Sequence, residues 1–216
     1  LLNYSFWLTK LATALGKIGH DIMLMAQDER AEIRLAGAGG SSAMAHKKNP
    51  ITAENACGLA RIVRSMIIPS YENALLWHER DLANSSSERF TLSHSMILLD
   101  DIIVKCNRVM SKLVVDSDKM KENIDLQKGL VMAEKVMLVL VDRGMSREDS
   151  HEILRNCSMQ AIETNQNLFD ICTKNIKITD KIDSEMLKEI FKPENHIGFS
   201  GVIVDRTVEK ARLYLD

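Results

Sequence analysis

The amino-acid sequence predicts an all-α fold, in which a bundle of long helices is followed by a small all-helical domain. Apolar residues recur at alternating spacings of three and four along several long segments, the pattern of helices that pack side by side. Only ten glycines and three prolines interrupt the 216 residues, and 45% of the side chains are hydrophobic. No period-two alternation is long enough to predict a substantial strand.

Three long helices are expected in the first part of the chain, over residues 1–25, 50–68 and 92–113. The first has no capping residue before its stripe, so we expect the sequence to begin inside a larger protein. The second is expected to begin at Asn49, as N-cap, with Pro50 at the first helical position. The stripe of the first helix comprises Leu1, Tyr4, Leu8, Leu11, Leu15, Ile18, Ile22 and Met25.

A polar run, DSDKMKEN at residues 116–123, predicts a domain boundary. We expect a bundle domain over 1–118, which contains the glycine-rich loop, and a helical domain over 119–216. In the second domain a shorter stripe runs from Leu126 to Leu140 and stops near Gly144. Ser146 and Asp149 have the spacing of a capping box, which predicts the start of another helix.

Composition excludes several classes of partner. The chain carries 28 basic and 30 acidic side chains, a net charge of −2, so no general attraction to nucleic acid or to an anionic membrane is expected. There is no apolar run of about 18 residues and no leader pattern, so we expect a cytoplasmic protein. The four cysteines are scattered without metal-ligand spacing and are expected to be buried free thiols.

The first candidate functional segment is the glycine-rich loop, AGAGGSSAMAHKKN at residues 36–49. Glycines give its backbone freedom, while two hydroxyls, an imidazole and two ammonium groups lie just before a helix N-terminus. Such a segment is suited to holding a carboxylate or phosphate, with Ser41 or Ser42 available for proton chemistry. The alternative is a mobile surface loop with solvated lysines.

The second candidate segment is WHERDLANSSSERF at residues 77–90. Ser85 and Arg89 are four residues apart and would share one helical face, which Arg80 joins only if the serine-rich centre breaks the helix. Two guanidinium groups with hydroxyls suit phosphate. The alternative is an exposed helix with Glu–Arg pairs.

Together the two segments resemble a known family. GSSAMAHKKNPITAE at residues 40–54 is similar to the signature loop of the fumarase/aspartase superfamily, GSSxMPxKxNPxxxE. WHERDLANSSSERF resembles the matching segment of the adenylosuccinate lyase family. The run that begins MKENIDLQKG is similar to the start of that family's C-terminal domain.

The resemblance implies a long-helix bundle of the fumarase/aspartase type and a homotetramer whose central bundle joins helices of four subunits, with active sites shared between subunits. It implies a lyase that acts on a small nucleotide substrate in purine biosynthesis. That enzyme removes fumarate from adenylosuccinate and from the succinyl-aminoimidazole-carboxamide ribotide by general base and general acid β-elimination, without metal or organic cofactor.

Carried over by position, Ser41 would be the general base, with Ser42 beside it. Lys47 and Asn49 would bind the succinyl carboxylate, and Glu54 would be the supporting carboxylate. Substrate binding would also involve Met44, and the phosphate would be held by Arg80, Ser85 and Arg89. The family's general-acid histidine lies in the N-terminal half, which no segment here resembles, so we expect this chain alone to be inactive.

Two departures and two alternatives accompany this assignment. Ala45 stands where the signature has proline, which should loosen the loop, and Ala83 replaces a common serine. The approach to the loop, from residue 15 to Met44, also resembles 3-carboxy-cis,cis-muconate cycloisomerase of the same superfamily. The third hypothesis is a non-catalytic helical oligomerisation module that kept the motifs, as the lens crystallins of this superfamily did.

Overall fold

A computed structural model describes residues 1–36 and 49–215, and it confirms the all-α fold. The chain divides into two compact units, Leu1–Met120 and Lys121–Asp216. No helix in the described part of the chain is both long and apolar enough to cross a membrane.

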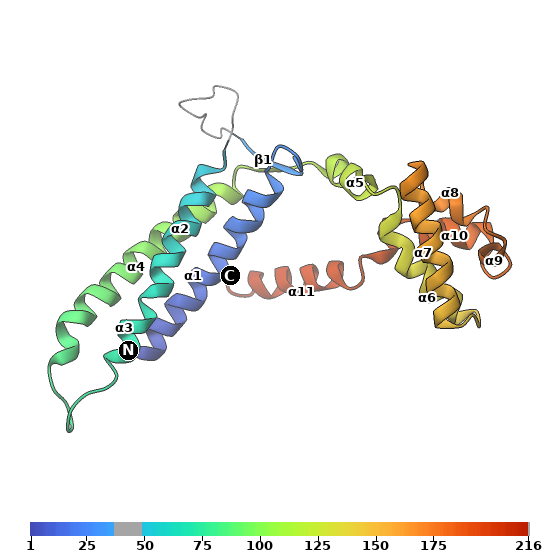
Figure 1. Ribbon diagram of the computed structural model, residues 1–216. Coiled ribbons are helices and arrows are strands. Elements are labelled where there is room, and N and C mark those ends of the chain that lie inside the picture. The colour runs from blue at the N-terminus through green and yellow to red at the C-terminus, as the bar shows by residue number, and fades with distance from the viewer. Residues whose placement is uncertain (37–48, 216) are drawn as a thin grey trace. The chain divides into compact units, whose positions relative to one another are not determined.

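The first unit is a bundle of three long helices, visible in Figure 1. Its elements are α1 (Leu2–Met25), β1 (Ile33–Leu35), α2 (Ile51–Ser65), α3 (Ile67–Glu72), α4 (Ala83–Met110) and β2 (Leu113–Val115). The helices α1, α2 and α4 pack against one another around a shared core. Its buried residues are Leu8, Ala12, Ala56, Ala60, Val63, Leu99 and Ile102.

The face that α1 turns to the core differs from the predicted stripe. Tyr4 and Ile18 are both 41% exposed, whereas the small residues Gly16 and Gly19 are buried. A Cβ added to Gly19 would lie 2.8 Å from the Cys57 sulfur of α2, so glycine is what allows the two helices to approach this closely. Close packing, rather than the largest apolar side chains, therefore decides which face of α1 is buried.

The unit also contains a small antiparallel sheet, in which β1 pairs with β2. Ile33 lies opposite Val115 and Leu35 opposite Leu113, so Leu113, assigned above to a helical stripe, is in a strand. The Ala36 amide also donates to the Lys112 carbonyl at 2.9 Å. The pairing anchors the chain directly before residue 37.

The second unit is built from short helices. After α5 (Ser117–Asp125), which crosses the division between the units, come η1 (Leu130–Met132), α6 (Ala133–Asp142), α7 (Arg147–Thr164), α8 (Leu168–Cys172), α9 (Ile176–Thr179), α10 (Ser184–Ile190), η2 (Pro193–His196) and α11 (Ser200–Arg212). The predicted capping box is confirmed: the Asp149 amide donates to Ser146 Oγ at 3.0 Å. Leu126 does not belong to the stripe, because it is 71% exposed.

Candidate active site

The beginning of α4 positions the residues expected to bind phosphate. Ser85 and Arg89 both lie in α4, one turn apart, with Ser85 half-buried and Arg89 exposed. Arg80 is exposed in the turn that precedes the helix. The serine-rich centre does not break the helix, since Ser85, Ser86 and Ser87 are all helical. Arg80 therefore reaches this end of the bundle from the preceding turn, and not through a break in α4.

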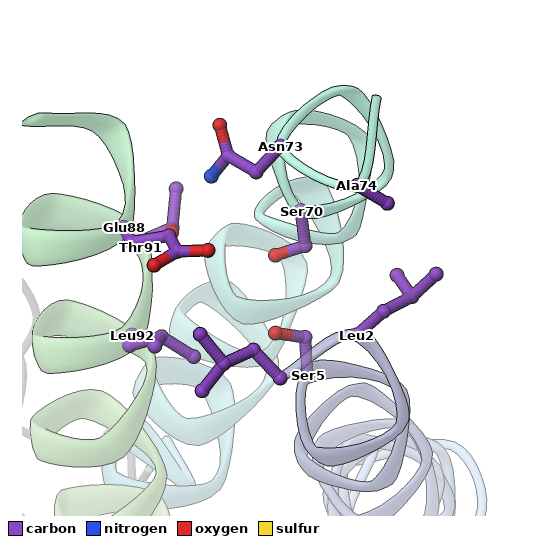
Figure 2. A pocket seen from close by; sticks show the side chains of 9 residues that line it. Leu2, Ser5, Ser70, Asn73, Ala74, Glu88, Thr91 and Leu92 are labelled. Carbon is purple, nitrogen blue, oxygen red and sulfur yellow. The ribbon is translucent and has the colours of Figure 1, made fainter. Parts of the chain in front are cut away.

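A pocket lies between the ends of α1, α3 and α4 at the same end of the unit (Figure 2). Its volume is about 260 Å³. Its lining comprises Leu1, Leu2, Ser5, Ser70, Asn73, Ala74, Glu88, Thr91 and Leu92. Within the described residues, the buried Thr91 hydroxyl and the Asn73 side-chain nitrogen have no hydrogen-bond partner. None of these residues was predicted to belong to a binding site, because their spacing shows no motif.

The other part of the predicted site lies where α2 begins. The prediction that Asn49 is the N-cap was wrong. The helix begins at Ile51 and its N-cap is Pro50, which makes no side-chain capping bond. The Pro50 carbonyl accepts a hydrogen bond from the Glu54 amide at 3.0 Å. Glu54 is exposed in the first turn of α2, where a carboxylate interacts favourably with the helix dipole.

Four of the predicted site residues fall outside the described part of the chain. These are Ser41, Ser42, Met44 and Lys47. Their segment leaves the sheet after Ala36 and returns to the described chain at Asn49. The roles given to them by resemblance therefore stay predictions.

The two groups of described site residues lie at opposite ends of the bundle. Ala53, beside Glu54, packs with Val109 of α4 and Ile33 of β1 in one apolar cluster. Arg89 precedes Val109 by twenty residues of continuous helix, which at 1.5 Å per residue separates the ends by about 30 Å. We call the end beside β1 and β2 the sheet end and the end at which α4 begins the arginine end (Figure 1).

The cysteines lie outside these groups, and all four are free. Burial raises the pKa of Cys57, whose sulfur lies 3.3 Å from the Gly16 carbonyl to which it donates. Cys157 and Cys172 interact in the core of the second unit, a proximity that their spacing did not predict. Hydrogen bonds from Cys172 and from the Asn175 amide lower the pKa of Cys157 to about 7. The described residues contain no cluster of three His, Cys, Asp or Glu side chains suited to a metal.

Comparisons with known proteins follow the same division of the chain. Residues 1–65 match the family described as "Lyase", and residues 129–207 match "Adenylosuccinate lyase C-terminus". Adenylosuccinate lyase of Archaeoglobus fulgidus is 40% identical over 209 residues, which cover 95% of this chain and 47% of the relative. That of Methanocaldococcus jannaschii is 39% identical over 211 residues, which cover 96% and 46%.

The chain is similar to adenylosuccinate lyase over nearly its whole length. It corresponds to the C-terminal half of that enzyme and spans just under half the length of the curated relatives it matches. Membership in the fumarase/aspartase superfamily is confirmed with it.

Solved structures of the superfamily share the fold. The 3-carboxy-cis,cis-muconate lactonizing enzyme of Pseudomonas putida has a TM-score of 0.86 and 29% identity, covering 100% of this chain and 48% of that one. A fumarate lyase of Mesorhizobium sp. BNC1 has a TM-score of 0.82 at 24% identity, covering 95% of this chain and 45% of that one, which shows the fold alone. Both units of this chain thus have counterparts in solved structures.

Proposed function

We propose that the protein containing this chain removes fumarate from adenylosuccinate, and from the succinyl-aminoimidazole-carboxamide ribotide, in purine nucleotide biosynthesis. The observation that carries the proposal is that Ser85 and Arg89 lie one turn apart in α4, with Arg80 in the segment just before that helix. Two forked guanidinium groups beside a hydroxyl match the oxygens of a phosphate dianion. The similarity to archaeal adenylosuccinate lyases supports the same substrate.

The proposed reaction is a β-elimination. Ser41 takes a proton from the succinyl carbon next to the C–N bond, the electron pair left behind forms the double bond of fumarate, and the nitrogen leaves with its electrons and gains a proton. Lys47 and Asn49 hold the carboxylate on which negative charge grows, with Met44 beside the substrate. Glu54 supports the loop from the first turn of α2. Ser42 is the neighbouring hydroxyl.

The separation of the two ends leads to a composite site. A gap of about 30 Å, from the helical rise between Arg89 and Val109, is far longer than a single nucleotide. The sheet end of one copy and the arginine end of another would therefore form one site, in a cytoplasmic homotetramer. Exposed apolar side chains along α1, among them Phe6 and Trp7 at 56% and 53% exposure, support association.

The decisive experiment measures fumarate release from adenylosuccinate by the full-length enzyme, with 3-carboxy-cis,cis-muconate as the competing substrate. We expect turnover of adenylosuccinate and none of the muconate. Turnover of the muconate alone would reject the proposal in favour of the cycloisomerase, a second candidate favoured by the structural similarity to the Pseudomonas putida enzyme.

The general base is tested by Ser41→Ala in the same enzyme. Because a base acts in the transition state, kcat should fall by about 100- to 10,000-fold while KM changes little. Ser42→Ala is measured beside it, because a large loss of kcat in that variant alone would make Ser42 the base. A Ser41→Ala enzyme with near-normal kcat would show that Ser41 is not the base.

A further inference from the structure

The turn before α4 is held together by one side chain, Asp81. Its Oδ2 accepts a hydrogen bond from the Trp77 amide at 2.7 Å, and its Oδ1 accepts one from the Ala83 amide at 2.8 Å. Ala83 is the first residue of α4, whereas Trp77 lies at the far side of the turn. Both oxygens therefore accept from backbone groups, and the bond to Trp77 encloses residues 78–80.

The two hydrogen bonds of Asp81 have different roles: the bond from Ala83 caps the start of α4, and the bond from Trp77 restrains the turn. Leu82 occupies the N-cap and has no side-chain acceptor, so Asp81 supplies the acceptor for the first amide of α4 from one position earlier. A helix start needs no second bond that reaches back four residues. The Trp77 bond instead fixes the path of the turn.

The conformation of the enclosed residues shows that this path is not a relaxed one. His78 has φ +54°, in the left-handed region that residues other than glycine rarely adopt. Such a residue persists only where its surroundings hold it. The Asp81 bonds on either side of His78 and Arg80 are the restraints that the structure shows here.

The charge of Asp81 makes its place informative. A free carboxylate next to a phosphate-binding arginine would repel the phosphate and compete for the guanidinium group. The two amides lower the pKa of Asp81 and hold its carboxylate against the backbone of the turn. It lies one residue after Arg80 and four residues before Ser85.

We propose that Asp81 is a positioning residue. It holds Arg80 close enough to Ser85 and Arg89 for the three side chains to bind one phosphate. The inference rests on the proposed function, because it takes a phosphate as the group that Arg80 binds. Asp81 itself does not touch the substrate, since both of its oxygens are bound to the backbone.

The test compares Asp81→Asn and Asp81→Ala in the full-length enzyme. Asparagine keeps one acceptor oxygen of nearly the same shape but presents an NH2 group in place of the second, so at least one of the two bonds to the backbone is lost. We expect KM for adenylosuccinate to rise about 5- to 20-fold in Asp81→Asn, with kcat within about two-fold. If Asp81→Ala fails to fold, Asp81→Asn carries the test.

Three controls make the result specific. Asp116→Asn removes a carboxylate whose Oδ1 accepts a hydrogen bond from the Lys119 amide at 3.0 Å. This carboxylate does not belong to the arginine end, so KM should not change. Succinyladenosine, which lacks the phosphate, should be processed equally by wild type and Asp81→Asn. In an Arg80→Ala background, Asp81→Asn should raise KM no further, because the residue it positions is gone.

The outcomes separate the two claims. A wild-type enzyme that does not release fumarate from adenylosuccinate overturns the proposed function. An active wild type in which Asp81→Asn leaves KM unchanged, lowers kcat alone, or adds its full effect to Arg80→Ala overturns the positioning role and leaves the proposed function standing.

Discussion

At the sheet end of the first unit, Gly19 lets α1 approach α2 so closely that an added Cβ would lie 3.1 Å from the Ala53 carbonyl oxygen. At the arginine end the same helix contributes Ser5 to a pocket of about 260 Å³, which also contains the Thr91 hydroxyl, a group with no hydrogen-bond partner among the described residues. One bundle thus has a closely packed end directly before residue 37 and an end that contains a pocket and carries the arginines. Under the composite site proposed above, the two ends would serve different copies of the protein, and each prediction below tests one side of that difference.

The largest effect is expected when defects at the two ends are mixed. Full-length Ser41→Ala and Arg89→Ala enzymes are unfolded, combined in equal amounts and refolded. The mixture is assayed at an adenylosuccinate concentration well below the wild-type KM, where the weakened binding of Arg89→Ala also makes that enzyme slow. If each site takes one end from each of two copies, random assembly gives about a quarter of the sites both native ends. Fumarate release should therefore recover to about a quarter of the wild-type rate.

The control for this experiment combines two defects of the same end. Arg80→Ala mixed with Arg89→Ala should recover nothing, because no arrangement of copies restores an intact arginine end. Recovery in this mixture, or none in the first, would contradict the division of the site between the ends.

The arginine end is tested by Arg89→Ala alone. A charge-assisted hydrogen bond contributes about 1.5–3 kcal/mol, so binding of adenylosuccinate should weaken about ten- to a hundred-fold. Adenosine monophosphate should compete in the wild type and poorly in the variant, which calorimetry measures. Arg108→Ala, an exposed arginine in the last turn of α4, is the matched control and should bind normally.

The packing of the sheet end is tested by Gly19→Ala. The new methyl group would lie 2.8 Å from the Cys57 sulfur, so the helices must separate, at a cost of about 1–3 kcal/mol. Gly58→Ala is the matched control, because nothing lies within 4 Å of its Cβ position. Thermal unfolding should show a lower midpoint for Gly19→Ala and an unchanged or higher one for Gly58→Ala.

The smallest effect is expected in the pocket of the arginine end. Thr91→Val replaces a buried hydroxyl without a partner among the described residues by a methyl group of similar size, which should stabilise the fold by about 1 kcal/mol. Thr13→Val removes an exposed hydroxyl that donates to the Thr9 carbonyl at 2.8 Å, and it should not stabilise. A lower unfolding midpoint for Thr91→Val would show that its hydroxyl has a partner in the assembled enzyme.

The sequence predicted what depends on local pattern. The three long helices follow from apolar spacing, and the start of α7 follows from the Ser146 and Asp149 pair, because capping is a bond between near neighbours. The buried face of α1 was not predictable, since glycines carry no hydrophobic signal and their value depends on Cys57 and Ala53 of another helix. Leu126 matched the period of a stripe by chance and is exposed.

For the site, the residue types and their segments could be predicted, but not their separation. Asn49 and Arg80 belong to motifs only about thirty residues apart in the chain, and nothing in their spacing shows that α2 and α3 carry the chain to the other end of the bundle. The role of Asp81 was not predicted, because its carboxylate binds two backbone amides and backbone amides leave no signal in a sequence. Tertiary geometry supplies both facts.

The pairing of β1 with β2 has a consequence for the order of synthesis. The strands are about eighty residues apart, so the partner of Ile33 leaves the ribosome only after α2, α3 and α4 have been made. A nascent chain that stops within α4 can form helices but has no partner strand for β1. The pairing of β1 with β2, which precedes the segment that carries Ser41, therefore forms late in the synthesis of the first unit.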